Sequence, residues 1–204
     1  MFDINYWNNF YKKEINLLPS QFAVFVANEY PEKNNIIDFG CGSARDTLFL
    51  SKFYKKVIGI DASTQIIAKN KKLESTKKNT VFLLNNLSNE NILIDSLNNE
   101  LREIKDCIFY ARFFLHAIDE DTENKLLNLY KICKNNNLLA LEFRTLKDKK
   151  LKKQFGNHFR RFIDLNYLID KVENLKLKVE YLVEGQGYAK YKVDDAFVAR
   201  MIII

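Results

Sequence analysis

Short apolar runs alternate with amphipathic stretches along most of the chain. The apolar runs predict β-strands near residues 35–39, 57–61, 80–84, 106–111 and 138–143. Between them, helical periodicity predicts α-helices near residues 45–53, 64–73, 91–103 and 121–134. Because parallel strands are joined by crossover helices, this alternation predicts an α/β fold built on a parallel sheet.

The two ends of the chain depart from this alternation. Residues 4–16 predict a short amphipathic helix or lid, and Pro19-Ser20 opens a helix over about 20–29. Near the other end, a helix over 165–174 is followed by two successive strands, over 177–184 and 196–204. The chain contains no Gly/Ser/Pro-rich linker, so we expect one domain over 1–204, with residues 1–30 as an N-terminal helical lid.

A glycine-rich turn lies between the first predicted strand and the following helix. It reads Asp38-Phe39-Gly40-Cys41-Gly42, and such a strand–turn–helix unit brings backbone N–H groups close to a ligand. About twenty residues on, the next strand ends at Asp61, where an acid can accept hydrogen bonds from both hydroxyls of a ribose. Together, the two signals indicate a cofactor that contains a nucleoside; the alternative is an ordinary βα turn that binds nothing.

The details of the turn narrow the choice of cofactor. A dinucleotide site needs a third glycine, but Arg45 or Asp46 stands at that position, and no Gly-Lys-Ser/Thr follows for a P-loop. An acid before the turn, Asp38, suits a cationic ligand with an amino group. This arrangement resembles the first two motifs of class I S-adenosylmethionine-dependent methyltransferases. The resemblance implies a Rossmann-like fold with a mostly parallel seven-stranded sheet, helices on both faces and a C-terminal antiparallel hairpin.

The same resemblance implies how S-adenosyl-L-methionine is bound. The two glycines let the backbone approach the methionine moiety, Asp38 anchors its amino group and Asp61 holds the ribose. Where many relatives carry an acid for adenine, this chain has Asn85-Asn86, which can accept from an amine or form a plain turn. Tyr11 can close over the cofactor from the lid or pack on the core. The candidate cofactor-binding residues are Tyr11, Asp38, Gly40, Gly42, Asp61, Asn86 and Tyr110.

Polar residues after the fourth and fifth strands are candidates for the acceptor side. Arg112 and His116 are four residues apart and can face one cleft if the chain winds into a helical turn after Phe113. A second group follows the fifth strand, and a third contains an Arg pair beside a histidine, suited to bidentate binding of phosphate or carboxylate. A structural histidine and a solvated basic loop are the alternatives. The candidate catalytic residues are Arg112, His116, Arg144, His158, Arg160 and Arg161.

Several stretches together resemble a narrower family, the bacterial methyltransferases associated with capsule and O-antigen polysaccharides. The matching stretches are 19–23, 40–46, 110–118, 142–145 with 147–148, 158–162 and 187–200. This resemblance implies an O-methyltransferase whose acceptor is a small anionic or carbohydrate molecule, which can be nucleotide-activated. The methylated group is a phosphate or phosphoramidate, which needs no strong base, or a sugar hydroxyl, for which His116 or His158 is the natural base.

Composition leaves two other functions open. The chain has 204 residues with 32 Lys or Arg and 26 Asp or Glu, a net charge of +6. A basic balance can indicate nucleic acid, so an RNA methyltransferase is one alternative. The lysines are nevertheless scattered in short runs, as on a solvated surface, and no DNA partner is expected. The other alternative is a non-catalytic module that binds the cofactor or a partner enzyme.

The cysteines and the absence of apolar spans bear on location. Cys41, Cys107 and Cys133 have no metal-ligand spacing, so no metal site is expected, and they are predicted to be reduced thiols. No apolar run approaches the roughly 20 residues that a transmembrane helix needs. The N-terminus also lacks the basic and apolar regions of a signal peptide. We therefore expect a cytoplasmic protein without a transmembrane segment.

Overall fold

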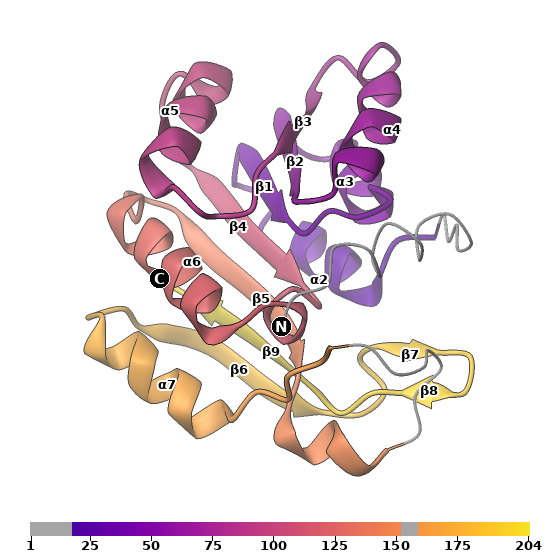
Figure 1. The fold of residues 1–204 in the computed structure, drawn as a ribbon, viewed down its shortest axis with the longest axis vertical. Helices are drawn as coiled ribbons and strands as arrows, with labels where there is room; N and C mark the ends of the chain where they lie inside the picture. The colour runs from indigo at the N-terminus through magenta and orange to yellow at the C-terminus, as the bar shows by residue number, and fades with distance from the viewer. Residues whose placement is uncertain (1–17, 152–158) are drawn as a thin grey trace.

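A computed structural model describes residues 18–151 and 159–204, which fold around a seven-stranded sheet (Figure 1). The strand order is β3-β2-β1-β4-β5-β9-β6. The first five strands run parallel, whereas β9 lies antiparallel between β5 and β6. The strands are β1 (Asn35–Phe39), β2 (Lys56–Asp61), β3 (Thr80–Leu84), β4 (Cys107–Arg112), β5 (Leu138–Arg144), β6 (Val179–Gly185) and β9 (Val198–Ile203).

Helices cover both faces of this sheet (Figure 1). On one face, α2 (Gln21–Glu29), α3 (Arg45–Leu50) and α4 (Thr64–Glu74) bury apolar side chains against the strands. On the other face, α5 (Glu90–Leu101), α6 (Glu120–Ile132) and α7 (Leu165–Asn174) build the larger core cluster. Within residues 18–151 and 159–204, no helix combines the length and the apolar character that crossing a membrane requires.

The observed elements confirm the predicted fold class. Strands β1 and β3 and helix α7 begin and end at the predicted residues, and the other predicted strands and helices of the described chain are present with shifted ends. Residues 4–16, predicted as a helix or lid, lie outside the described residues, and the lid over 1–30 stays a prediction. Within the 20–29 segment, α2 buries Phe22, Ala23 and Val26 completely in the core.

The predicted C-terminal hairpin has an insertion that the sequence analysis missed. Between β6 and β9 the chain forms a second, two-stranded sheet from β7 (Lys190–Tyr191) and β8 (Asp194–Asp195). Two-residue strands are too short to show the alternation by which strands are predicted. In Figure 1 this small sheet lies at the end of the molecule near the carboxyl end of β5.

Charged residues inside the sheet share one face, the face that α2 and α3 cover. Side chains alternate between faces along a strand, so Tyr110 and Arg112 of β4 point the same way. The backbone register then sets Arg112 beside Glu142 of β5, and Glu142 beside Arg200 of β9. A row of cation, carboxylate and cation therefore crosses three adjacent strands near their ends.

The start of α2 is fixed to the start of α3 by one buried carboxylate. Asp46 accepts hydrogen bonds from the backbone N–H of Ser20 (2.7 Å), from its hydroxyl (2.7 Å) and from the hydroxyl of Tyr110 (2.8 Å). Ser20 is also the N-cap of α2, since its Oγ accepts from the N–H of Ala23. Asp46 thus joins α2, α3 and β4 directly behind the glycine turn.

Candidate functional site

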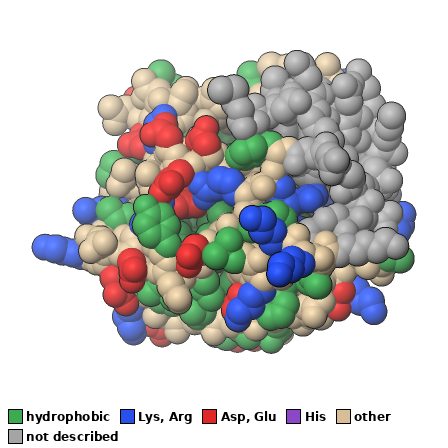
Figure 2. Space-filling model, turned by 60° about the horizontal axis from the view of Figure 1, so that its bottom comes forward, with side chains coloured by type: hydrophobic (Ala, Val, Ile, Leu, Met, Phe, Trp, Pro, Cys, Tyr) green, Lys and Arg blue, Asp and Glu red, His purple; other side chains and the backbone are tan. Residues whose placement is uncertain are grey.

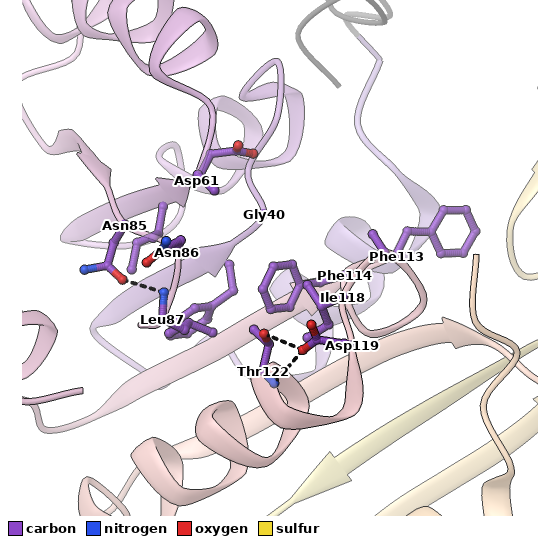
Figure 3. Close-up of a pocket in the computed structure, with 14 residues that line it drawn as sticks. Gly40, Asp61, Asn85, Asn86, Leu87, Phe113, Phe114, Ile118, Asp119 and Thr122 are labelled. Carbon is purple, nitrogen blue, oxygen red and sulfur yellow. Dashed lines mark hydrogen bonds between the residues drawn. The ribbon is translucent and has the colours of Figure 1, made fainter. Parts of the chain in front are cut away.

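A cavity of about 440 Å³ opens at the carboxyl ends of β1 to β4 (Figure 3). Its volume lies within the usual range for small-molecule sites, and this end of an open parallel sheet is where ligands bind. Apolar side chains form most of the wall, with the polar groups of Asp61, Asn85 and Asn86 along one side. The lining residues are Phe39, Gly40, Ile60, Asp61, Ala62, Asn85, Asn86, Leu87, Phe113, Phe114, Ala117, Ile118, Asp119 and Thr122.

The glycine turn has the backbone that a ligand-binding loop requires. Gly40 and Gly42 both have positive φ angles, 72° and 50°, where a side chain is strained. A Cβ at Gly40 would lie only 2.6 Å from Cδ2 of Phe114, which lines the cavity. The N–H groups of Gly40 and Cys41 donate to the carbonyl of Ile60 at 2.8 and 2.9 Å, which fixes the turn against β2.

Asp61 ends β2 and is oriented by the same turn. Its Oδ2 accepts from the N–H of Gly42 at 3.0 Å, and its Oδ1 accepts from the N–H of Ser63 at 2.9 Å. Burial raises the pKa of Asp61, although the backbone N–H groups of Ser63, Gly42 and Ala62 oppose that rise. Each carboxylate oxygen keeps a further lone pair. The side chain can therefore accept from both hydroxyls of a ribose in the cavity.

Asp38 lies beneath the glycine turn and is almost completely buried. Its Oδ2 accepts a hydrogen bond of 2.6 Å from the hydroxyl of Thr47 in α3. Burial raises the pKa of Asp38 from 3.8 to about 8, with Asp46 and Asp61 adding to the rise and Thr47 opposing it. Without a ligand, Asp38 is therefore mainly protonated at pH 7, and a cation beside it would favour the carboxylate.

The two asparagines after β3 line the cavity, as Figure 3 shows. The side-chain oxygen of Asn85 accepts from the N–H of Leu87 at 2.7 Å, and that of Asn86 from the N–H of Ser88 at 3.0 Å. Both amides therefore shape the turn, as the plain-turn alternative expects. Neither bond occupies the amide NH₂ group, so each side chain can still donate to a ring nitrogen as well as accept from an amine.

The loop after β4 turns through an unusual backbone conformation. Phe113 has a φ angle of 54°, which is rare for an aromatic residue and marks a locally strained backbone. In Figure 3 the ring of Phe114 lies at the cavity, whereas the ring of Phe113 points away from it. The Phe113 ring centroid lies 4.2 Å from Cζ of Arg112 and 5.0 Å from the ring centroid of His116. Arg112 and His116 therefore both contact the Phe113 ring, through this reversal and the short 3₁₀ turn Leu115–Ala117. That the two side chains face one cleft stays a prediction.

Tyr110, predicted to bind the cofactor, lies away from the cavity. Its side chain is completely buried, its ring stacks on that of Phe22 at 5.1 Å, and its hydroxyl donates to Asp46. The observed contacts of Tyr110 are therefore those of a residue that attaches α2 and α3 to the sheet. A contact between Tyr110 and the cofactor stays a prediction.

The predicted catalytic arginines differ in how many of their guanidinium nitrogens bond to carboxylates. Arg144 donates to Asp148 (2.7 Å) and twice to Asp194 (3.2 and 2.8 Å). Arg161 forms an ion pair with the buried carboxylate of Glu123 in α6. These ion pairs connect Arg144 to β8 and Arg161 to α6. A role for either guanidinium in binding an acceptor stays a prediction.

Among the described residues, Arg112 forms a hydrogen bond through only one of its three guanidinium nitrogens. Its Nε donates to the buried carboxylate of Glu142 at 3.0 Å, and Arg200 donates to the other oxygen of that carboxylate at 2.9 Å. Glu142 lies within β5, which continues to Arg144. Burial raises the pKa of Glu142, while the two guanidinium groups oppose the rise.

Two further predicted site residues lie outside the described ranges, and a third, Arg160, lies near the start of the range 159–204. Tyr11 and His158 belong to residues 1–17 and 152–158, which the structure does not describe. Arg160 is half-buried in the segment that precedes α7. Within residues 18–151 and 159–204, no group of three or more His, Cys, Asp or Glu side chains could hold a metal ion.

Sequence reasoning missed two residues at the start of α3. Asp46 connects three elements, and burial, followed by the charge of Arg112, lowers the pKa of Arg45. In the sequence, Arg45 and Asp46 served only to exclude a dinucleotide site, because they stand where that motif has its third glycine. The signal in the sequence was this pair of charged residues soon after the glycine turn.

Comparisons with known proteins agree with this geometry. A family profile described as "Methyltransferase domain" matches residues 37–141, which include the glycine turn, Asp61, both asparagines and the loop after β4. No curated protein sequence matches the chain significantly.

Solved structures of low sequence identity share the fold over almost the whole chain. A SAM-dependent methyltransferase from Anabaena variabilis ATCC 29413 is 19% identical, with a TM-score of 0.71 over 98% of this chain and 91% of that chain. One from Aquifex aeolicus is also 19% identical, with a TM-score of 0.65 over all of both chains. The glycopeptide N-methyltransferase MtfA, solved with S-adenosyl-L-methionine, is 11% identical, with a TM-score of 0.68 over 94% of this chain and 89% of that chain. At these identities the likeness concerns the fold alone.

Proposed function

The chain belongs to the methyltransferase domain family and is an S-adenosylmethionine-dependent enzyme, and on that premise we propose which of its residues bind the cofactor and which face the acceptor. The adenosine occupies the cavity of about 440 Å³, with its ribose on Asp61 and its base between Asn86 and the apolar wall. The methionine part lies over the glycine turn, where Gly40 allows close approach and Asp38 binds the amino group. When bound, the cofactor supplies an electrophilic methyl group.

One observation supports this arrangement above the others. The turn fixes Asp61 from two sides, because Gly42 and Ser63 donate to opposite oxygens of its carboxylate at 3.0 and 2.9 Å. The carboxylate therefore keeps its orientation before any ligand arrives, and preorganised groups bind at lower cost. The acceptor oxygens of Asp61 and Asp38 fit the ribose hydroxyls of an adenosine and the cationic amino group of its amino-acid tail, which supports the proposed cofactor contacts.

The acceptor is proposed to bind on the far side of Phe113, near the ends of β4 and β5. Phe113 supports this location, because it is part of the cavity lining while its ring contacts Arg112 and His116. The protein's main task is to align the acceptor oxygen with the methyl group. An anionic oxygen needs orientation only, whereas a sugar hydroxyl needs a base, for which buried His116 is the described candidate.

We propose O-methylation in surface polysaccharide synthesis as the physiological reaction, on a phosphate, a phosphoramidate or a sugar hydroxyl. The support is the resemblance of several stretches to capsule and O-antigen methyltransferases, together with a basic chain of net charge +6. A cytoplasmic location is part of this proposal; its support is that Cys41, Cys107 and Cys133 are all unpaired.

Calorimetric titration with S-adenosylhomocysteine tests the cofactor assignment. We expect micromolar binding to the wild type, and about tenfold to hundredfold weaker binding to Asp61→Asn, because charge-assisted hydrogen bonds are lost. Asp95→Asn, an exposed carboxylate on α5, is the matched control and should bind like the wild type. Absence of binding to the wild type would contradict the assignment. Methyl transfer to RNA transcripts, with none to nucleotide-activated or phosphorylated sugars, would contradict the proposed acceptor class.

A further inference from the structure

Arg112 presents a fixed guanidinium fork beside the proposed cofactor site. Its Nε donates to Glu142, a carboxylate whose side chain is fully buried, while the Arg112 side chain is 16% exposed. The stacked contact of 4.2 Å with Phe113 holds the guanidinium plane. Among the described residues, neither terminal nitrogen of Arg112 has a hydrogen-bond partner. The Nη1–Nη2 edge is therefore held rigidly and left open, which is the geometry that binds phosphate or carboxylate with two hydrogen bonds.

A second guanidinium lies next to this fork. Arg45 is 22% exposed, and its Nε lies 3.8 Å from Asp46, beyond hydrogen-bond distance. Asp46 is already occupied by three donors from Ser20 and Tyr110, so it does not hold Arg45 in place. One of these donors is the hydroxyl of Tyr110, which points to the same face of β4 as Arg112. Arg45 therefore lies over the side of the sheet that carries Arg112, and burial, followed by the charge of Arg112, lowers the pKa of Arg45. The described residues give the Arg45 guanidinium no hydrogen bond.

The other arginines of the same sheet face provide a contrast. Arg144 uses its terminal nitrogens on Asp148 and Asp194, and Arg200 uses Nε on Glu142 and Nη2 on the carbonyl of Tyr188. Those side chains connect parts of the fold. Arg45 and Arg112, by comparison, have no described hydrogen-bond partner for their terminal nitrogens.

Position assigns this pair to the acceptor rather than to the adenosine. Arg112 is not among the residues that line the cavity; it is bonded to β5, and its Phe113 partner packs against the cluster of Ala189, Ala196 and Val198 near β7 to β9. Figure 2 shows Lys and Arg side chains gathered across the middle of the face that looks onto this end of the molecule. Exposed Lys149 and Lys150 of the 3₁₀ segment Leu146–Lys150 and Lys190 and Lys192 of the β7–β8 region add positive charge there. Such a field concentrates anionic molecules at the opening.

We propose that Arg45 and Arg112 together form the binding site for an anionic group, a phosphate or carboxylate, carried by the methyl acceptor, and that Glu142 positions Arg112 for it. The inference rests on the proposed function, since it names the acceptor class of that same site. The same chemistry has a second source, the carboxylate of the cofactor's methionine part, and the experiment separates the two.

The test uses three ligands and five proteins. S-Adenosylhomocysteine carries the methionine carboxylate, 5′-methylthioadenosine lacks the whole amino-acid part, and inorganic phosphate stands in for the acceptor's anion. The proteins are the wild type, Arg45→Gln, Arg112→Gln, Arg112→Lys and Arg102→Gln, in which Arg102 is an exposed arginine at the end of α5. Calorimetry measures both nucleosides on the free proteins, and phosphate on proteins saturated with S-adenosylhomocysteine. Thermal denaturation identifies any variant that fails to fold.

We expect the wild type and Arg102→Gln to bind phosphate equally, and Arg45→Gln and Arg112→Gln to bind it at least about tenfold more weakly. Arg112→Lys should also bind it more weakly, because an ammonium keeps the charge but lacks the fork. Affinity for both nucleosides should change by less than about threefold. A tenfold loss for S-adenosylhomocysteine, with 5′-methylthioadenosine unchanged, would overturn the proposal in favour of the cofactor's carboxylate. Equal phosphate binding by all five proteins would also overturn it. Failure of the wild type to bind S-adenosylhomocysteine would instead contradict the proposed function.

Discussion

Deprotonation of Asp38 on cofactor binding is a consequence of its buried position. The pKa of about 8 in the unliganded protein means that roughly nine-tenths of Asp38 is protonated at pH 7. The cationic amino group of the cofactor requires the carboxylate, so binding at pH 7 must first remove this proton at a cost of about 1.4 kcal/mol. The apparent Kd for S-adenosylhomocysteine should therefore fall about tenfold between pH 6 and 7, and level off above pH 8.

Calorimetry at pH 7 in two zwitterionic buffers with different ionisation enthalpies measures the released proton directly. We expect close to one proton per S-adenosylhomocysteine bound, and none from Asp38→Asn, which cannot titrate. Binding of 5′-methylthioadenosine, which has no amino group, should release none from Asp38 in the wild type. A wild-type Kd that is flat from pH 6 to 8, together with heats that do not depend on the buffer, would refute the reasoning.

The raised pKa of Asp38 also determines how the stability of the unliganded protein changes with pH. A carboxyl whose pKa rises from 3.8 to about 8 on folding stabilises the folded state most at pH values below 3.8, its pKa in the unfolded chain. That contribution is lost as the pH rises through 8. The melting temperature of the unliganded wild type should therefore fall, relative to that of Asp38→Asn, between about pH 4 and 8. An identical pH dependence of the two proteins would contradict the burial argument.

Two further changes test the glycine turn and the carboxylate behind it. Gly40→Ala should lower stability by at least about 1–2 kcal/mol for its positive φ angle and weaken S-adenosylhomocysteine binding, because its Cβ displaces Phe114. Gly187→Ala, with a φ angle of 85° but open space around it, is the matched control and should lower only the stability; equal binding losses in both would contradict the steric argument. Asp46→Asn should lower the free energy of unfolding by roughly 2–4 kcal/mol in chemical denaturation, since an amide NH₂ cannot accept from the two hydroxyls that donate to one oxygen. The exposed control Asp95→Asn should leave it unchanged, and a similar small effect of both would show that the buried bonds contribute little.

Periodicity in the sequence predicted most of the fold because burial on both faces leaves a continuous apolar signal. Strand β1 has four buried residues out of five, and β5 is buried over all seven. The small sheet of β7 and β8 carries no such signal, because it forms through contacts with other parts of the chain. Its Asp194 is fixed by Arg144, which lies 50 residues earlier in the sequence.

The cofactor side of the site was more predictable than the acceptor side for a related reason. Gly40, Asp61 and Asn86 lie at or just after the carboxyl ends of predicted parallel strands, so their meeting at one edge of the sheet could be inferred. The row of Arg112, Glu142 and Arg200 depends on the register between strands. Which arginines are occupied and which are open depends on carboxylates brought in from distant segments. A list of basic residues near strand ends does not contain that information.

The internal position of β9 has a consequence for how the molecule acquires its structure. Each residue from Val198 to Ile203 is buried, and β9 lies between β5 and β6, so the last strand of the sheet in sequence is an internal one. While the chain is being synthesised, the edges of β5 and β6 stay without their shared partner until this final strand has left the ribosome. Folding of the sheet is therefore expected to complete after translation of Ile203 rather than progressively, and to be slow because its pairings are far apart in sequence. A nascent chain that stalls before Val198 would expose two unpaired strand edges, which favours recognition by chaperones or aggregation.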